Sequence, residues 1–360
     1  MVTSVGFSIE GMAGPGSGAW RRFELVTDGL VSAGLEVHVS GDAEVHEAAH
    51  NRNFSSVTLA RSRRKLDRLT GRSKRIGEFA GMTGADVVHV EAPPYFGSPN
   101  IPTIASVHDL RHLLGLRIGG SMSEVLYQRH VLKSFRPNII YWLALSDWGR
   151  QEMIELLGIP EQQVVTVPPI ILAPPNKINR NSTRAYVLAL GHLEPRKNLE
   201  VLIRAAGSRE WPAGLELWLA GADHGSLGSL RTLANDLRVN VRFLGPVSEA
   251  EKWELLVDAS IVAVPSIIEG FGIVAVEAPL SGTVALVSNA SGLAELAGHP
   301  FARIPWNSPS AWAAAITALC ETAELHDEIL TAQLECARSF LPEAVIPKLS
   351  NLYRRVTLSA

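Results

Sequence analysis

Hydrophobic residues fall in short runs, and longer stretches between them carry apolar residues every three or four positions. In the first half the runs lie at residues 4–9, 35–39, 86–90, 103–107, 140–145 and 164–167. In the second half they lie at residues 185–191, 215–221, 241–244, 261–264 and 283–288. Short apolar runs that alternate with helical patterns are typical of βαβ units, whose parallel strands are buried on both faces. The pattern predicts an α/β protein with two doubly wound parallel sheets.

A proline-rich polar stretch separates the two series. Four prolines lie between residues 168 and 175, and polar residues follow up to residue 184, a composition that continues neither a helix nor a central strand. A chain of 360 residues also exceeds the size at which one core keeps growing. We therefore predict an N-terminal βα domain at 1–170, a linker at 171–184, a second βα domain at 185–340 and a C-terminal helix at 341–360.

Composition narrows the classes of function. The formal net charge of −3 gives no reason to expect nucleic acid as a partner, and no apolar run is long enough to span a bilayer. The N-terminus lacks a basic stretch followed by an apolar core, so we expect a cytoplasmic location. Cys320 and Cys336 lack the closely spaced partners of a zinc site, and we expect both to be buried free thiols.

Two acidic residues flank the glycine turn after the fourth apolar run of the second half. Glu269 precedes Gly270-Phe271-Gly272, and Glu277 lies among apolar residues about two turns into the following predicted helix. The glycines permit close backbone approach, and free N–H groups of the first helical turn suit anionic or hydroxyl-rich ligands. In the alternative interpretation, Glu269 caps the helix by its charge and Glu277 is a solvated surface residue.

Two adjacent cations follow the first apolar run of the second half. Arg196 and Lys197 lie in the segment Gly191–Leu199, directly before a predicted helix. At the carboxyl edge of a parallel sheet such a pair can hold a diphosphate, since arginine offers a planar fork and lysine a compact charge. The alternative is a surface loop with Asn198 as the helix cap and both cations in solvent.

The first domain carries weaker signals. A glycine-rich loop, Gly11–Gly18, precedes a predicted helix at 20–30, and His108 ends an apolar run. A dinucleotide-binding site with Asp42 as the ribose acid is a minor alternative, because the G-x-G-x-x-G spacing is not met. The basic block Arg61–Arg75 is either a solvated segment or a contact with anionic lipid or a lipid-diphosphate acceptor.

These segments resemble retaining glycosyltransferases of the GT-B fold (glycosyltransferase family 4, group 1 type), which include bacterial mannosyl-, rhamnosyl- and glucosyltransferases. Residues 191–199 are similar to the family's phosphate segment, 269–277 to its E-x7-E motif, and 241–245 to the strand before its nucleotide-base contact. The match is collinear over nearly the whole chain. It implies a GT-B architecture, with two Rossmann-like domains facing each other across a cleft.

The resemblance also implies roles for single residues. Arg196 and Lys197 would hold the donor diphosphate, Glu269 would meet the transferred sugar, Glu277 the ribose hydroxyls, and His108 would lie near the transferred sugar. The implied catalytic residues are Arg196, Lys197, Glu269 and His108. The implied donor-binding residues are Gly16, Gly18, Gly191, Gly245, Gly270, Phe271, Gly272, Ile273 and Glu277.

One position departs from the family pattern. His192 stands where many relatives carry arginine, so the cation pair is Arg196 with Lys197. In the alternative, His192 takes the arginine's place and diphosphate affinity depends on pH. Enzymes of this family usually need no metal, and the sequence has no Asp-x-Asp motif. We expect no cofactor beyond a nucleotide-sugar co-substrate.

The resemblance implies a metal-independent enzyme that transfers a hexosyl group with retention of configuration. The donor is a nucleotide-diphosphate sugar, with mannosyl or rhamnosyl slightly favoured. The acceptor is a hydroxyl of a saccharide or lipid-linked saccharide, in polysaccharide or glycolipid assembly, and the enzyme is cytoplasmic or peripheral on the inner membrane face. Two alternatives remain, a GT-B nucleotide-sugar epimerase and a non-catalytic sugar-nucleotide-binding protein.

Overall fold

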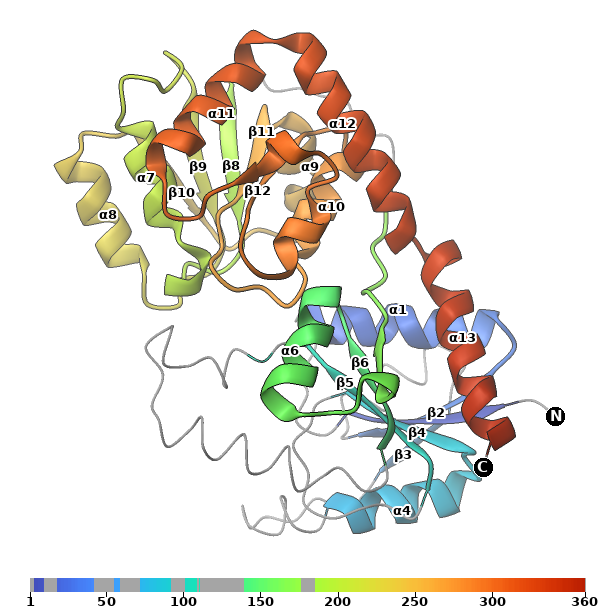
Figure 1. The fold of residues 1–360 in the computed structure, drawn as a ribbon. Helices are drawn as coiled ribbons and strands as arrows, with labels where there is room; N and C mark the ends of the chain where they lie inside the picture. The colour runs from blue at the N-terminus through green and yellow to red at the C-terminus, as the bar shows by residue number, and fades with distance from the viewer. Residues whose placement is uncertain are drawn as a thin grey trace. The chain divides into compact units, whose positions relative to one another are not determined.

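The computed structural model describes residues 3–9, 18–41, 55–58, 72–91, 101–108, 110, 139–175 and 185–359. It divides into two compact units. Unit 1 comprises Met1–Ile170 and Pro342–Ala360, and unit 2 comprises Ile171–Leu341. Each unit contains one parallel sheet with helices, as the hydrophobic pattern predicts (Figure 1).

The sheet of unit 1 has the strand order β3-β2-β1-β4-β5-β6-β7, and all its pairings are parallel. Its strands are β1 (Ser4–Ser8), β2 (Glu36–Gly41), β3 (Ser55–Thr58), β4 (Val87–Val90), β5 (Thr103–Val107), β6 (Ile139–Ala144) and β7 (Val164–Thr166). All six strands predicted for this half are present. The sequence does not predict β3, because this edge strand contains one apolar residue, Val57.

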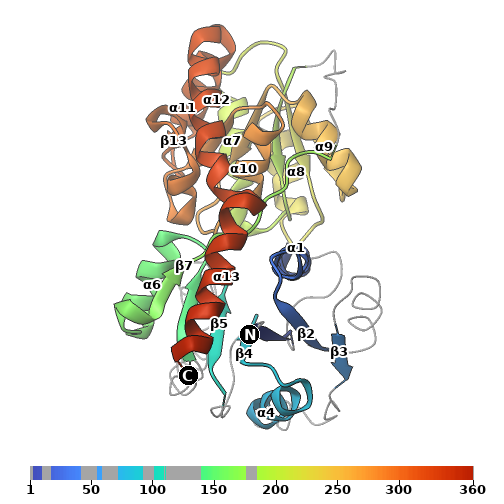
Figure 2. The ribbon, with the colours of Figure 1, turned by 90° about the vertical axis from the view of Figure 1, so that its right-hand side faces the viewer.

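Helices cover both faces of this sheet. They are α1 (Gly18–Ser32), α4 (Arg72–Thr83), α6 (Asp147–Leu157) and α13 (Pro342–Ser359), with a short 3-10 helix η3 (Glu161–Gln163). One buried cluster joins α1 and α13 to the sheet through Phe23 and Tyr353, and a second joins α4 and α6 through Ile76 and Met153. The C-terminal helix therefore belongs to unit 1, which it reaches after the whole of unit 2 (Figure 2).

The sheet of unit 2 has the order β10-β9-β8-β11-β12-β13, again with parallel pairings. Its strands are β8 (Tyr186–Leu190), β9 (Glu216–Ala220), β10 (Val241–Gly245), β11 (Ile261–Val264), β12 (Ala285–Ser288) and β13 (Arg303–Ile304). The five predicted strands are present. The two-residue edge strand β13 is too short to give an apolar run.

The helices of unit 2 form two groups. They are α7 (Leu199–Ala206), α8 (Leu227–Asp236), α9 (Glu249–Asp258), α10 (Ile273–Leu280), α11 (Pro309–Glu321) and α12 (Ala323–Ala337), with the 3-10 helices η4 (Pro195–Lys197), η5 (Ser291–Leu296), η6 (Pro300–Ala302) and η7 (Arg338–Phe340). Helix α7 packs against α8 and α11, whereas α10 packs against α9 and α12. Parallel strands with helices in this arrangement place ligands at the carboxyl edge of the sheet.

Two predictions concern the burial of the cysteines and the presence of membrane-spanning segments. The prediction of buried thiols is wrong, because Cys320 is exposed on α11 and Cys336 is half-buried on α12. The buried face of α11 instead carries Trp312, Ile316 and Leu319. Across the described ranges, none of the helices combines the length and the apolar character needed to cross a bilayer.

Candidate active site

The loops after β8 and β11 meet where the strand order of unit 2 reverses. Strands β8 and β11 are hydrogen-bonded neighbours, yet the chain continues from β8 to β9 on one side and from β11 to β12 on the other. Such a switch point leaves a crevice outside the carboxyl ends of the strands. The predicted phosphate segment follows β8 and the predicted E-x7-E motif follows β11, so the fold brings these two segments together.

The carboxylate of Glu269 is the centre of this junction. Arg196 Nη1 lies 2.8 Å from its Oε2, and the ammonium of Lys197 contacts its Oε1. The hydroxyl of Ser266 donates to Oε1 at 3.0 Å, and the backbone N–H of Glu269 donates to Ser291 Oγ at 3.0 Å. Glu269 is therefore fixed on both its carboxylate and its main chain.

These contacts set the charge of Glu269. Burial alone raises the pKa of the carboxyl, but Lys197 and Arg196 outweigh it, and the pKa lies below its ordinary value. The site thus holds a buried, ionised carboxylate. Glu269 is not a hydrogen-bonding cap of α10, because Gly272 is the N-cap and no side chain bonds there.

Arg196 is anchored by more than Glu269. Its Nη2 lies 2.6 Å from Glu194 Oε1, its Nη1 donates to the Ile268 carbonyl at 3.1 Å, and its own carbonyl accepts from Ile267 N–H at 2.8 Å. The Arg196 side chain is 15% exposed and that of Lys197 18%. The alternative with both cations in solvent is therefore wrong, and Glu194 is a partner that the sequence reasoning missed.

Two glycines are required by the backbone of these loops. Gly191 has φ 139° and Gly272 has φ 103°, values that side chains rarely permit. A Cβ on Gly272 would also lie 2.3 Å from Leu293. Both positions are left-handed turns that bring the backbone to the crevice.

The other predicted donor-binding residues of unit 2 lie at the same edge. Gly270 and Ile273 are half-buried beside Gly272. Phe271 is buried and packs edge-on against Phe340, with ring centroids 5.0 Å apart. Its ring therefore supports the turn, and its backbone is the part at the crevice edge. Gly245 ends β10 with φ 75°.

Glu277 has a buried partner of its own. Helix α10 begins at Ile273, so Glu277 lies about one turn inside the helix. The prediction that Glu277 lies two turns inside is wrong, because residues 269–272 are not helical. Lys252 Nζ lies 2.5 Å from Glu277 Oε1 and 2.8 Å from Glu249. Glu277 is 3% exposed and Lys252 8%, which rules out the solvated-surface alternative.

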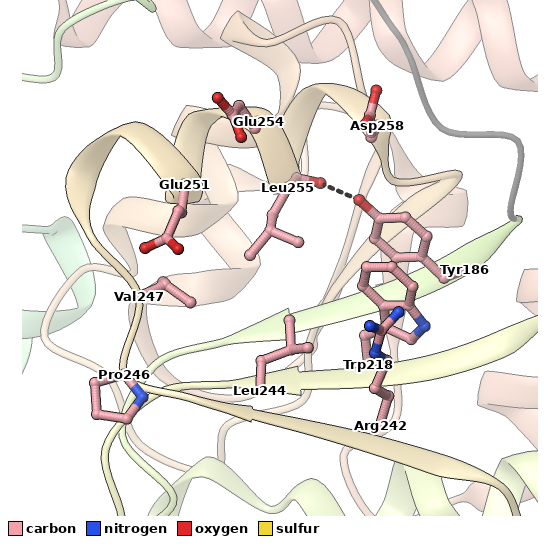
Figure 3. A pocket seen from close by; sticks show the side chains of 10 residues that line it. All are labelled: Tyr186, Trp218, Arg242, Leu244, Pro246, Val247, Glu251, Glu254, Leu255 and Asp258. Atoms are coloured by element: carbon pink, nitrogen blue, oxygen red, sulfur yellow. Dashed lines mark hydrogen bonds between the residues drawn. The ribbon is translucent and has the colours of Figure 1, made fainter.

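A cavity of about 320 Å³ opens between α9 and the strands β8 to β10 (Figure 3). Its lining residues are Tyr186, Trp218, Arg242, Leu244, Pro246, Val247, Glu251, Glu254, Leu255 and Asp258. At one end the rings of Tyr186 and Trp218 stack at 3.9 Å, and the Arg242 guanidinium lies 4.5 Å from the Trp218 ring. At the other end lies the segment after β10, which the resemblance assigns to the nucleotide base.

Two histidines stack beside the cation pair. The rings of His192 and His224 are nearly parallel, with centroids 4.0 Å apart. The backbone N–H of His224 donates to the Leu193 carbonyl at 3.0 Å. This bond connects the loops after β8 and β9. Burial and the neighbouring His224 lower the pKa of His192. His192 is among the residues considered from the sequence, but His224 was not predicted, although it lies in the loop after the next strand, β9.

In unit 1, His108 directly follows β5 and contacts Glu91. Its Nε2 lies 3.0 Å from Glu91 Oε2 and 2.9 Å from the Glu91 carbonyl oxygen. Glu91 is fully buried and also bonds to Arg22 Nη1, at 2.8 and 2.6 Å. Glu91 and Arg22 were not predicted as site residues, although Glu91 directly follows the apolar run 86–90.

Several predicted residues lie outside the described ranges. They are Gly16, Asp42 and residues 61–71 of the basic block. Gly18 is the first residue of α1. Arg75 lies in α4 and is 8% exposed, which at this residue fits neither the solvated segment nor the lipid contact.

Both halves match family models. Residues 16–171 match the model "Glycosyltransferase Family 4", and residues 173–332 match "Glycosyl transferases group 1". The chain is 34% identical over 177 residues to a D-inositol 3-phosphate glycosyltransferase of Corynebacterium glutamicum, covering 46% of this chain and 42% of that protein. It is 29% identical over 249 residues to a phosphatidyl-myo-inositol mannosyltransferase of Mycobacterium leprae, covering 64% and 63%.

The fold has close counterparts among solved structures. The Anabaena protein Alr3699/HepE, solved in complex with UDP and glucose, superposes with a TM-score of 0.76 at 16% identity, over 98% of this chain and all of that one. The matched regions span less than two thirds of the length of the curated relatives above. Fold and family models together define an α/β protein of GT-B architecture. The chain belongs to glycosyltransferase family 4.

Proposed function

We propose that this protein is a glycosyltransferase that moves a hexosyl group from a nucleotide-diphosphate sugar to an acceptor hydroxyl. The observation that carries the proposal is the junction in which Arg196 and Lys197 both bind the buried carboxylate of Glu269 at the switch point of unit 2. Cations at this edge suit a diphosphate, and a fixed carboxylate suits sugar hydroxyls.

The proposed orientation of the donor follows the order of these groups. The diphosphate lies against Lys197 and the Gly191 turn, and the sugar lies against Glu269 and the amides of Gly270 to Gly272. The ribose lies at Glu277 and the base at the segment after β10. Positive charge at the diphosphate then stabilises the negative charge of the leaving nucleotide.

The proposed stereochemistry, metal requirement, donor sugar and acceptor rest on the resemblance to the family. We propose retention of anomeric configuration, by attack on the same face from which the nucleotide departs, and no requirement for a metal. A mannosyl or rhamnosyl donor is favoured. A saccharide or lipid-linked acceptor suits polysaccharide or glycolipid assembly on the cytoplasmic side of a membrane, and the two relatives above are named as enzymes acting on inositol derivatives.

A binding screen followed by a turnover assay tests the proposal. UDP, GDP, ADP and dTDP are each added to the protein, and a rise in melting temperature identifies the base, since a ligand that binds only the folded state stabilises it. The matching nucleotide sugars are then assayed for nucleotide release with and without acceptor, in the presence of EDTA. No thermal response to any diphosphate would refute the proposal. Release without acceptor and with an altered sugar would indicate an epimerase instead.

A further inference from the structure

The charges around Glu269 balance in the ligand-free protein. Arg196 and Lys197 both contact the carboxylate of Glu269, and Arg196 also pairs with Glu194. Two cations therefore face two carboxylates, and each cation already has a carboxylate partner. A diphosphate that enters this junction adds negative charge, so it must share or take over a cation that a carboxylate holds.

The two cations differ in how firmly they are held. The guanidinium of Arg196 bonds to two carboxylates and a backbone carbonyl. Within the described ranges, the ammonium of Lys197 has one hydrogen-bond partner, the carboxylate of Glu269. The ammonium also lies beside the Gly191 turn, since a Cβ built on Gly191 would be 3.4 Å from Lys197 Nζ. Lys197 is therefore the cation that can leave its carboxylate for a diphosphate at this turn.

We propose that Glu269 and the diphosphate of the nucleotide compete for the ammonium of Lys197. In the ligand-free protein the ammonium stays on Glu269 Oε1. When a nucleotide sugar binds, the ammonium moves to the diphosphate, and a hydroxyl of the sugar donates to Oε1 in its place. This inference rests on the proposed function for the positions of the diphosphate and the sugar.

The exchange gives Glu269 a part in the release of the nucleotide. A complete donor brings an anion for the ammonium and a hydroxyl for the carboxylate. After transfer the nucleoside diphosphate remains without the sugar, and Oε1 keeps the Ser266 hydroxyl but lacks its second donor. A buried carboxylate oxygen that has lost a charged donor is costly, so Glu269 draws the ammonium back. The product therefore binds more weakly than its contacts alone would allow.

A shared ammonium is the arrangement that competes with this proposal. An ammonium has three N–H donors, so one lysine has enough donors for both anions. In that arrangement Glu269 holds Lys197 in place for the diphosphate, and removal of the carboxylate weakens diphosphate binding. Competition predicts the opposite sign, because removal of the carboxylate frees the ammonium.

The variant Glu269→Gln distinguishes the two arrangements. It keeps an acceptor oxygen for Arg196 and removes the charge that holds the ammonium. Inorganic pyrophosphate, UDP and GDP are titrated into the full chain at pH 7.5 and followed by calorimetry. The variant should bind pyrophosphate about tenfold more tightly than the wild-type protein, the effect of one charge-assisted hydrogen bond. Equal or weaker binding by the folded variant would overturn the proposal.

The same substitution in a Lys197→Met background separates competition from a general effect of charge. Without the ammonium there is no cation to release, so Glu269→Gln should change the affinity less than about twofold. An equal gain in both backgrounds contradicts the competition. Glu200→Gln is the matched control, because it removes the same charge at an exposed position in the first turn of α7. The control should bind pyrophosphate as the wild-type protein does.

Pyrophosphate keeps this test separate from the proposed function, because it carries neither base nor sugar. Tighter pyrophosphate binding by Glu269→Gln, with no turnover of any nucleotide sugar by the wild-type protein, contradicts the proposed function and leaves the competition standing. Turnover by the wild-type protein without tighter binding by the variant contradicts the competition alone. Absence of pyrophosphate binding in every one of these proteins also contradicts the competition.

Discussion

The guanidinium of Arg196 and the carboxylate of Glu269 lie 2.8 Å apart and join the loops after β8 and β11, 73 residues apart in the chain. Arg196 also bonds to Glu194 and to the Ile268 carbonyl, so its guanidinium is committed within the protein. The ammonium of Lys197 contacts the other oxygen of Glu269. We therefore predict separable roles for the two cations, with Arg196 anchoring the junction and Lys197 meeting the proposed donor.

Substitution of the two cations should separate stability from donor binding. Arg196→Met removes the guanidinium that bonds to Glu194 and Glu269. The free energy of unfolding should therefore fall by about 3 kcal/mol. Lys197→Met leaves Glu269 paired with Arg196, so we expect a loss below about 1 kcal/mol, together with at least hundredfold weaker turnover.

Urea unfolding and steady-state kinetics measure both quantities, and Arg204→Met at an exposed position of α7 is the control. A stable Arg196→Met protein together with normal turnover by Lys197→Met would reverse the assignment of roles.

The buried pair of Lys252 and Glu277 gives a second prediction. Lys252→Met removes the ammonium that bonds to Glu277, which is 3% exposed, and should cost about 3 to 5 kcal/mol of unfolding free energy. The double variant Lys252→Met with Glu277→Gln removes both charges and should recover at least half of that loss. It should not recover donor binding, because the proposed ribose contact is then absent.

Chemical unfolding of Lys252→Met, of Glu277→Gln and of the double variant gives the coupling energy, with Lys348→Met on the exposed face of α13 as control. Additive effects in the double variant would show that the pair is not coupled.

The sequence predicted the strands and the segment at each strand end, but not the partners of the charged side chains. Runs such as 261–264 identify a buried strand, and the residue after it then lies at the carboxyl edge. The pairing of Lys252 with Glu277 depends on how α9 packs on α10, which no local pattern specifies. Glu91 was missed for the same reason, since its partner Arg22 comes from α1.

The short edge strands show a second limit of predicting strands from the sequence. The strand β3 contains one apolar residue and β13 has only two residues, so the hydrophobic pattern that predicts the central strands is absent there. Backbone pairing with β2 and β12 creates these strands instead. This pairing is a tertiary contact, and the local hydrophobic periodicity of the sequence does not predict it.

A third prediction concerns acid sensitivity of unit 1. Burial lowers the pKa of His89 from 6.5 to about 4. Above pH 6.5 the imidazole is neutral in both folded and unfolded chains. Between pH 6.5 and about 4 the unfolded chain takes up a proton that the folded chain refuses, so the free energy of unfolding falls as pH falls. The total loss should be about 3 kcal/mol.

The window from pH 6.5 to 4.5 separates this effect from the titration of Glu91. The pKa of Glu91 is lowered in the folded chain, so its contribution is present above its ordinary value of 4.5 and is lost only below it. Urea unfolding at several pH values should show a shallower dependence for His89→Gln than for the wild-type protein. Parallel curves for the two proteins would show that His89 does not carry the effect.

The stacked pair of His192 and His224 predicts that donor affinity depends on pH. Burial and His224, with smaller effects of Lys197 and Arg196, lower the pKa of His192, so its imidazole is neutral at pH 7.5 without ligand. A bound diphosphate adds negative charge beside the pair and favours protonation. Because binding then takes up a proton, affinity for the donor should rise as pH falls from 8 to 6, up to about tenfold per pH unit.

His192→Arg removes this dependence, because a guanidinium keeps its charge throughout the range. Calorimetric titration with UDP-glucose or GDP-mannose is suitable, since a diphosphate esterified at both ends has no proton of its own to exchange near pH 7. We expect the variant to bind at pH 8 as tightly as the wild-type protein does at pH 6. His326→Gln, on α12, is the control and should follow the wild-type curve. If wild type and His192→Arg show the same pH dependence, the charge at the diphosphate comes from Lys197 alone.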